Sequence, residues 1–213
     1  MKRREILVAA AAAAAASGAQ AANQIVERML PPSPPKPKAP EHVFPKVMAD
    51  WWGQGMYEAL EKDGMGISAP GPAGRKKAFI AFDSQCPWCH RLHQQLIPLY
   101  NRVEVVWFPV ATLSIWSEPQ GAMMLAAKDP WKLFLHHMDI FRADEKPRGI
   151  RVDPAKIWDI PVKFREAVWT NSKIVRRNVC RTIPYGVFKN SKGEFIPLYS
   201  RMTTEELAKI FEL

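Results

Sequence analysis

Several features on which other classes of protein depend are missing from this chain of 213 residues. Its longest apolar run, Ile6 to Ala16, has 11 residues, whereas a membrane-spanning helix needs about 20. No second C-x-x-C motif accompanies Cys86 and Cys89, no basic run is interleaved with aromatic residues, and no internal repeat is visible. These absences argue against a transmembrane anchor, a zinc site, nucleic-acid binding and a repeat architecture.

The remaining composition is that of a folded domain. Hydrophobic residues make up 47% and charged residues 24% of the chain, close to the average for globular proteins. The formal net charge is +9, and it becomes 27 minus 20, or +7, without residues 1–21. A positive sign alone does not identify a partner. The length leaves room for one ordinary domain and an appendage.

The N-terminus has the pattern of an export signal. Three basic residues, Lys2 to Arg4, precede the short apolar run, and Ala19-Gln20-Ala21 has the A-x-A form of a cleavage site. We therefore predict a signal peptide at 1–21 and a soluble mature protein in the periplasm. The pair Arg3-Arg4 also resembles a degenerate twin-arginine signal, so both export routes remain open.

Proline dominates the next segment. Residues 31–40 read PPSPPKPKAP, which favours an extended polyproline-type spacer, and we assign 22–47 to such a spacer. Residues 48–75 are expected to form a helix and a loop that lead into the domain. The helix is expected at 48–60, with Asp50 as its N-cap. Its pair Trp51-Trp52 either packs on the domain or contacts a second copy or a membrane surface.

Apolar runs and helical spacing alternate along the rest of the chain. Strands are expected at 77–82, 103–110, 183–188 and 194–198, and helices at 86–100, within 118–179 and at 204–211, the last capped by Thr203. This order predicts an α/β domain with a mixed sheet.

The motif Cys86-Pro87-Trp88-Cys89-His90 lies where a strand gives way to a helix. A thiol in the first helical turn is close to unsatisfied amides and to the positive end of the helix dipole, so its thiolate is stabilised. Cys86 is therefore the expected nucleophile. Cys89 lies one turn deeper and is the expected resolving thiol, while Pro87 presets the helical φ.

Three other interpretations of the motif remain. A structural disulfide is one, although so short a loop stabilises little. A zinc site would need His90 and His93, but neighbouring Cys89 and His90 point to different sides of a helix. Covalent haem attachment is the strongest alternative, because C-x-x-C-H is the c-type motif. Against it, the motif directly follows a buried strand.

The stretch FIAFDSQCPWCHRLHQQLIPLYNRVEVVWFP resembles the active-site region of periplasmic disulfide isomerases of the DsbC/DsbG type, in the thioredoxin superfamily. Downstream, Arg181-Thr182-Ile183-Pro184 resembles the loop in which thioredoxins place a cis-proline. The resemblance covers 76–213. It implies a thioredoxin-like fold with a helical insertion, at about 118–179, between the active-site βαβ part and the cis-Pro strand.

The resemblance also implies the function of the site residues. Pro184 would be cis and shape the substrate groove, and the backbone of Ile183 would pair with an extended substrate, with Pro87 and Trp88 as further substrate-binding residues. The partners would be proteins with thiols or disulfides and a membrane electron donor or acceptor. No cofactor or metal is expected beyond a redox-active Cys86–Cys89 disulfide.

Two departures from the family pattern bear on the activity. Residues 22–75 are too few for the family's N-terminal dimerisation domain, and Ile183 stands where these isomerases carry Thr. Thiol-disulfide exchange is thus better supported than isomerisation, and a reductase or isomerase role is favoured over an oxidase. Oligomerisation stays open, and a non-enzymatic adaptor of the same fold is the remaining alternative.

The third cysteine and a pair of histidines lie outside the motif. Cys180 is expected to be an inert core thiol, with a reactive or intermolecular thiol as the alternative. His136 and His137 are helix neighbours that diverge by about 100°, so they are expected to be surface and core residues rather than a metal pair.

Overall fold

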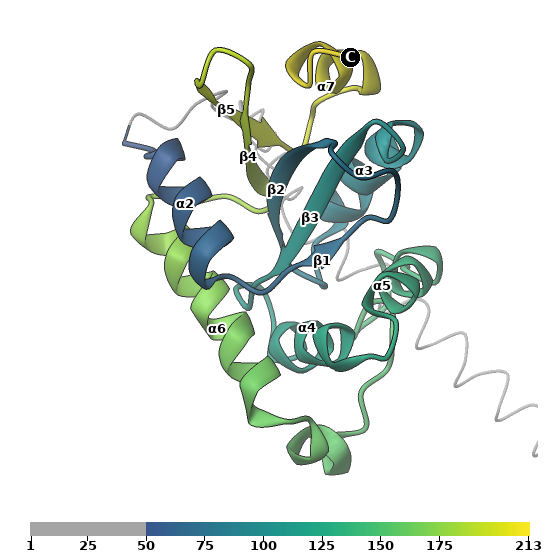
Figure 1. Cartoon of the computed structure of the whole chain (residues 1–213). Helices are drawn as coiled ribbons and strands as arrows, with labels where there is room; N and C mark the ends of the chain where they lie inside the picture. Colours follow the sequence, from purple (N-terminus) through teal and green to yellow (C-terminus); the bar gives the residue numbers. More distant parts are fainter. Residues whose placement is uncertain (1–49) are drawn as a thin grey trace, which may run out of the picture. The chain divides into compact units, whose positions relative to one another are not determined.

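The computed structural model describes residues 50–213, so the predicted signal peptide (1–21) and spacer (22–47) lie outside the described residues. Within this part of the chain, the strands form one sheet in the order β1-β3-β2-β4-β5 (Figure 1). The strands are β1 (Ile67–Ser68), β2 (Lys76–Phe82), β3 (Val103–Pro109), β4 (Tyr185–Lys189) and β5 (Phe195–Tyr199). β2 and β3 run parallel and the other neighbours are antiparallel, which confirms the predicted mixed sheet.

Helices connect the strands and cover the sheet. They are α2 (Gly53–Asp63), α3 (Pro87–Leu96), α4 (Ser117–Ala126), α5 (Pro130–Asp139), α6 (Val162–Arg177) and α7 (Thr204–Ile210), with short 3-10 turns η1 (Ile97–Leu99) and η2 (Pro154–Asp159). The segment α4–α6 lies between β3 and β4 in the chain, where the helical insertion was predicted. None of the helices within 50–213 has the length and apolarity that crossing a bilayer requires.

The central strand β2 contributes to both faces of the sheet, because successive strand residues point to opposite sides. Ile80 and Phe82 are buried in the core that also holds side chains of α3, α5 and α7. Phe79 and Ala81 pack with α2 and the end of α6, on the other face (Figure 1). Burial of each large apolar side chain contributes about 1.5–3 kcal/mol, so the end of β2, where the cysteine motif follows, is held firmly.

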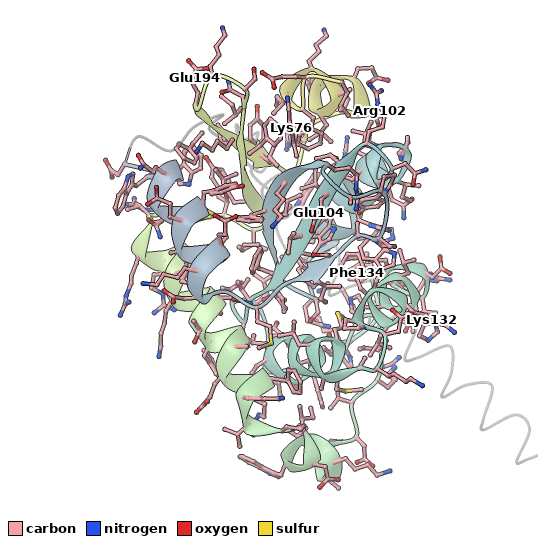
Figure 2. The ribbon with its side chains drawn as sticks, viewed as in Figure 1. Lys76, Arg102, Glu104, Lys132, Phe134 and Glu194 are labelled. Atoms are coloured by element: carbon pink, nitrogen blue, oxygen red, sulfur yellow. The ribbon has the colours of Figure 1, made fainter. Side chains whose placement is uncertain are left out.

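Helix α5 shows how the insertion joins this core. Asp129 caps it by accepting a hydrogen bond from the Lys132 amide (2.9 Å), and Pro130 is its first residue. The Phe134 ring is completely buried and meets Phe82 edge to face, with 5.3 Å between ring centroids. Lys132 lies on the outer side of α5 (Figure 2). One face of α5 thus packs against the sheet and the other faces solvent.

The two predicted helix caps have different outcomes. Thr203 caps α7 as expected, and its side chain and that of Glu206 form a reciprocal capping box. The prediction that Asp50 caps α2 is wrong, because the helix begins at Gly53 and Trp52 occupies the cap position. Trp51 instead packs edge to face against Tyr185, with 5.4 Å between ring centroids.

Close packing of the tryptophans explains this start. A Cβ atom at Gly53 would collide with the Trp51 ring, and one at Gly55 would collide with the Trp52 ring. The two glycines therefore lower helix propensity but allow the rings to approach the backbone. Of the two interpretations of this pair, Trp51 fits packing on the domain, while Trp52 is 61% exposed.

One strand was not predicted, and another begins two residues later than predicted; the other strand bounds differ by at most a single residue. A loop is expected between the helix at 48–60 and residue 75, yet Ile67 and Ser68 pair with β3, and the Ile67 side chain is buried in the core. β4 begins at Tyr185 rather than at Ile183, since Pro184 has no amide hydrogen to donate to a sheet.

The end of α6 contains a backbone conformation that is unfavourable for its residue. The amide of Cys180 donates to the Val175 carbonyl and that of Val179 to the Arg176 carbonyl, both at 3.1 Å, which is the Schellman arrangement. This arrangement places Val179 at φ 59°. Glycine is the usual residue there, because a left-handed conformation costs a β-branched residue about 1–2 kcal/mol.

We predict that Val179→Gly stabilises the protein by about 0.5–1 kcal/mol, since relief of the left-handed strain outweighs the greater entropy of glycine in the unfolded chain. Chemical denaturation measures the change. Val179→Ala is the control, and it should gain less because alanine keeps a Cβ atom. A glycine variant less stable than the alanine variant would contradict the prediction.

Candidate active site

The cysteine motif lies at the junction of β2 and α3. Cys86 is the N-cap of α3, with extended φ and ψ of −94° and 115°, and Pro87 follows as the first helical residue. The Cys86 carbonyl accepts hydrogen bonds from the amides of Cys89 (3.1 Å) and His90 (3.3 Å). The Cys86 side chain therefore stands at the positive end of α3.

The two thiols have different environments. The pKa of Cys86 is lowered, chiefly by a hydrogen bond from the Cys89 thiol and also by the backbone amides of Cys89 and Trp88, although burial opposes the shift. Burial, followed by the interaction with Cys86, raises the pKa of Cys89 well above its ordinary value of 9.0. Both thiols are free in this structure. Cys86 is thus the better nucleophile and Cys89 the weaker acid.

The Ile183-Pro184 loop lies against Cys86, although 97 residues separate Cys86 from Ile183 in the chain. The Ile183–Pro184 peptide bond is cis, and the Cys86 thiol donates to the Ile183 carbonyl at 3.4 Å. Pro184 is buried and Ile183 is half-buried. Cys86 itself is 3% exposed, whereas Pro87 is exposed and Trp88 half-buried, so the accessible rim next to the thiol is formed by its neighbours in the chain and by Ile183.

Asp83, the first residue after β2, was given no role by the sequence. Its carboxylate is buried, with 1% exposure, and accepts five hydrogen bonds. The donors are the amides of Gln85 (2.9 Å), Thr112 (2.8 Å) and Leu113 (2.9 Å) and the hydroxyls of Thr112 (3.1 Å) and Ser117 (2.7 Å). Asp83 therefore ties the motif loop to the loop after β3 and to α4.

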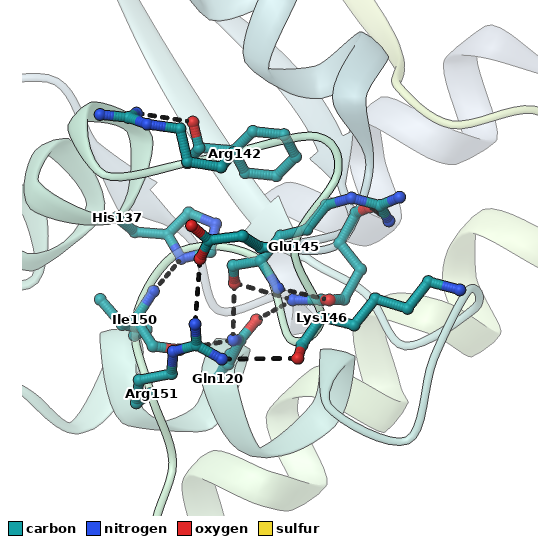
Figure 3. A network of polar contacts seen from close by, with 10 residues as sticks. Gln120, His137, Arg142, Glu145, Lys146, Ile150 and Arg151 are labelled. Atoms are coloured by element: carbon teal, nitrogen blue, oxygen red, sulfur yellow. Dashed lines mark hydrogen bonds and ion pairs between the residues drawn. The ribbon is translucent and has the colours of Figure 1, made fainter. Parts of the chain in front are cut away.

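Gln85, next to Cys86, forms a second connection to the insertion. Its side-chain amide donates to Gln120 (2.6 Å) and to the Arg148 carbonyl (3.0 Å), and its side-chain carbonyl accepts from the Arg148 amide (3.0 Å). The Arg148 guanidinium donates back to the Gln85 backbone carbonyl at 2.8 Å. Gln120 also donates to the Ile150 carbonyl at 2.6 Å (Figure 3). The loop after α5 is thereby fastened beside the cysteines.

His137 completes this connection. The Ile150 amide donates to His137 Nδ1 (3.3 Å), so Nε2 carries the hydrogen and donates to the Ser84 carbonyl (3.0 Å). Gly149 adopts a left-handed conformation (φ 68°) and lies so close to the His137 ring that a Cβ atom at residue 149 would collide with the ring. His137 is buried and His136 exposed, which confirms the predicted core and surface positions.

The other two histidines of the region have aromatic partners. The His90 ring stacks on Phe141, with 5.1 Å between centroids and 12° between planes. His93 Nδ1 bonds the Tyr100 hydroxyl (2.8 Å), which also accepts from Trp107 Nε1 (3.3 Å). Within residues 50–213, no three side chains form a cluster suited to a metal ion.

Cys180 is held apart from this chemistry. Its thiol donates to the Thr182 carbonyl at 3.4 Å, and burial raises its pKa to about 12. The side chain packs with Ile183 against the second core. These observations favour the inert-thiol interpretation over the reactive one.

Comparisons with known proteins support the fold. Neither a scan against protein-family models nor a search of curated proteins finds a match. The catalytic domain of Proteus mirabilis ScsC is 18% identical and aligns over 76% of this chain and 97% of its own, with a TM-score of 0.56. A thiol-disulfide exchange protein of Wolbachia pipientis, alpha-DsbA2, is 13% identical over 75% and 96%, with a TM-score of 0.54.

A periplasmic thioredoxin-like protein of Salmonella enterica serovar Typhimurium is 15% identical over 74% of this chain and 94% of its own, with a TM-score of 0.51. These likenesses confirm the thioredoxin-like fold with a helical insertion. At such low identities they show the fold alone, so the DsbC/DsbG subtype stays a prediction.

We predict that acid destabilises the protein through its buried histidines. Burial lowers the pKa values of His93 and His137 from 6.5 to about 4, so the unfolded chain binds more protons between these values and stability falls as the pH decreases. Each histidine then costs about 2 kcal/mol between about pH 7 and about pH 5. Denaturation of the wild type and His137→Gln at both pH values measures the slope. An unchanged slope in the variant would refute the assignment.

A second prediction concerns thiol reactivity. Iodoacetamide should modify only Cys86 in the native protein, with a pH midpoint below the ordinary thiol pKa of 9.0, because the thiolate is the reactive form. Cys89 and Cys180 should react only after unfolding. Peptide mapping by mass spectrometry identifies the labelled residue, and comparable labelling of native Cys89 is the contrary outcome.

Proposed function

We propose that this protein exchanges disulfides with other proteins through Cys86 and Cys89. The observation that carries the proposal is the difference between the two thiols: Cys86 has a lowered pKa at a helix N-terminus beside the Ile183 carbonyl, and Cys89 is buried with a raised pKa. A structural pair would not need this asymmetry. Haem attachment, the alternative for C-x-x-C-H, gains no comparable support, since the His90 ring is stacked on Phe141.

The reaction proceeds in two steps. The Cys86 thiolate attacks one sulfur of a substrate disulfide, which forms a Cys86–substrate disulfide and releases the other substrate sulfur as a thiolate that takes up a proton. Cys89 then loses its proton and attacks the Cys86 sulfur. The substrate leaves with two reduced thiols, and the protein retains a Cys86–Cys89 disulfide. Reversal of both steps oxidises a dithiol substrate. No cofactor is needed beyond this disulfide.

The rim around Cys86 suits an extended peptide. Ile183 lies in the loop before β4, where its backbone can pair with a substrate strand, and Pro184 shapes the groove beside it. Pro87 and Trp88, which follow Cys86 in the chain, provide accessible surface next to it. These positions support the substrate-binding roles assigned to the residues from the sequence.

We assign the reaction to the periplasm, with protein clients and a membrane electron donor or acceptor as partners. The predicted signal peptide at 1–21 supports export, and one structural neighbour is described as periplasmic. A reductase or isomerase of the DsbC/DsbG type is favoured over an oxidase, because such enzymes need Cys86 as a free thiolate ready to attack. The reduction potential of the pair relative to its compartment decides the direction.

We predict different outcomes for the two cysteine variants. Cys86→Ser should lower disulfide exchange to the uncatalysed rate, because no nucleophile remains. Cys89→Ser should accumulate mixed disulfides with clients, because attack occurs without resolution. Non-reducing gels and mass spectrometry of the trapped species measure both effects.

Cys180→Ser serves as the matched control and should behave as the wild type. Equal trapping by the Cys86 and Cys89 variants would refute the assigned roles. Binding of a partner that survives loss of both cysteines, without any redox activity, would favour the adaptor alternative.

A further inference from the structure

Two arginines lie over the aromatic ring of the active-site motif. The guanidinium carbon of Arg91 is 5.7 Å from the centroid of the Trp88 ring, and that of Arg201 is 5.5 Å from it. Trp88 is the residue between Pro87 and Cys89, so both cations border the nucleophile's rim. Such contacts hold a guanidinium in place without neutralising its charge.

Both arginines are placed by regular structure. Arg91 follows Trp88 by three residues on α3, the spacing at which helical side chains meet. Arg201 lies in the turn between β5 and α7, which is anchored to α3 because the Thr204 hydroxyl donates to the Gln95 carbonyl (2.9 Å) and its amide to the Gln95 side chain (3.1 Å). Arg91 and Arg201 are both exposed.

A third guanidinium reaches the motif from the insertion. Arg148 contacts the Gln85 carbonyl, one residue before Cys86. Among residues 50–213, neither Arg91 nor Arg148 forms a salt bridge. The acid of the motif loop, Asp83, is buried, and its carboxylate is occupied by five hydrogen bonds. In the loop that carries Arg148, Glu145 is paired with Arg151 (2.9 Å), and the exposed Asp144 is outnumbered by Arg142 and Lys146. Positive charge therefore predominates beside Cys86.

We infer that Arg91, Arg201 and Arg148 form a recognition surface for client proteins whose reactive cysteines lie beside acidic residues. The inference rests on the proposed exchange activity and names its substrate class. Guanidinium groups that are already held in place lose little side-chain freedom on binding a carboxylate. Opposite charges also raise the rate of encounter, and salt screens this effect.

The test compares short synthetic peptides with one cysteine, flanked by glutamate, glutamine or lysine, each as a mixed disulfide with neutral 2-mercaptoethanol. Released thiol is followed with the full mature protein, and each rate is divided by that of the same peptide with dithiothreitol, which removes intrinsic differences among the peptides. We expect the glutamate peptide to react about tenfold faster than the lysine peptide at about 0.01 M salt, with the ratio approaching one at about 1 M.

The variant Arg91→Glu/Arg201→Glu should reverse the preference. Its readout is the ratio of the glutamate and lysine rates, which cancels any change in Cys86 reactivity. Lys173→Glu is the matched control, because it reverses a charge on α6, whose last turns pack on the other face of the sheet. The ratio of the glutamate and lysine rates in this variant should stay within about twofold of the wild-type ratio.

The possible results distinguish a failure of this inference from a failure of the proposed exchange activity. Exchange with all three peptides at equal normalised rates, or a preference that persists in the double variant, overturns the recognition surface and leaves the exchange activity standing. If the double variant does not fold, the salt dependence of the glutamate-to-lysine rate ratio in the wild type still tests the recognition surface. No exchange with any peptide or with neutral bis(2-hydroxyethyl) disulfide overturns the proposed function itself.

Discussion

The buried carboxylate of Asp83 is the interaction on which the geometry of the site depends. It joins the end of β2 to Thr112 and Leu113 after β3 and to Ser117 at the start of α4. A charge this deep is tolerated because five N–H and O–H groups surround it, and each of them would lose its partner if the carboxylate were removed. Cys86 follows only three residues later, so its position at the start of α3 is set by the same contacts.

The insertion is fastened to the motif by polar contacts, whereas the sheet below is held by apolar packing. Hydrogen bonds connect Gln85, Gln120 and Arg148 to one another, and the His137 ring joins Ser84 to Ile150 in the same way. Hydrogen bonds are directional and apolar contacts are not, so this network sets the orientation of the motif loop while the core supplies most of the stability. The proposed attack of Cys86 on a substrate sulfur would need both kinds of support.

The regular parts of this arrangement could be predicted from the sequence, because local patterns encode them. The apolar run of β2, the cap at Thr203 and the cysteine spacing each depend on neighbouring residues. Asp83, Gln85 and Arg201 could not be assigned a role, because their partners lie far away in the chain and hydrogen-bonding residues leave no periodic signal. Asp50 failed as a cap for a related reason: tertiary packing of Trp51 decided where α2 begins.

The charged groups of the site are the buried carboxylate of Asp83 and the exposed guanidinium groups of Arg91 and Arg201 near Trp88. The negative charge of Asp83 raises the pKa values of both Cys86 and Cys89, so it works against thiolate formation. At Cys86, the hydrogen bonds from the Cys89 thiol and from the first amides of α3 outweigh both burial and this charge, so the pKa is lowered. At Cys89, burial is the largest cause of the raised pKa, and the interaction with Cys86 adds to it. The difference between the two thiols therefore arises from the hydrogen bonds that only Cys86 receives from the first amides of α3 and from the complete burial of Cys89, and the proposed order of attack rests on this difference.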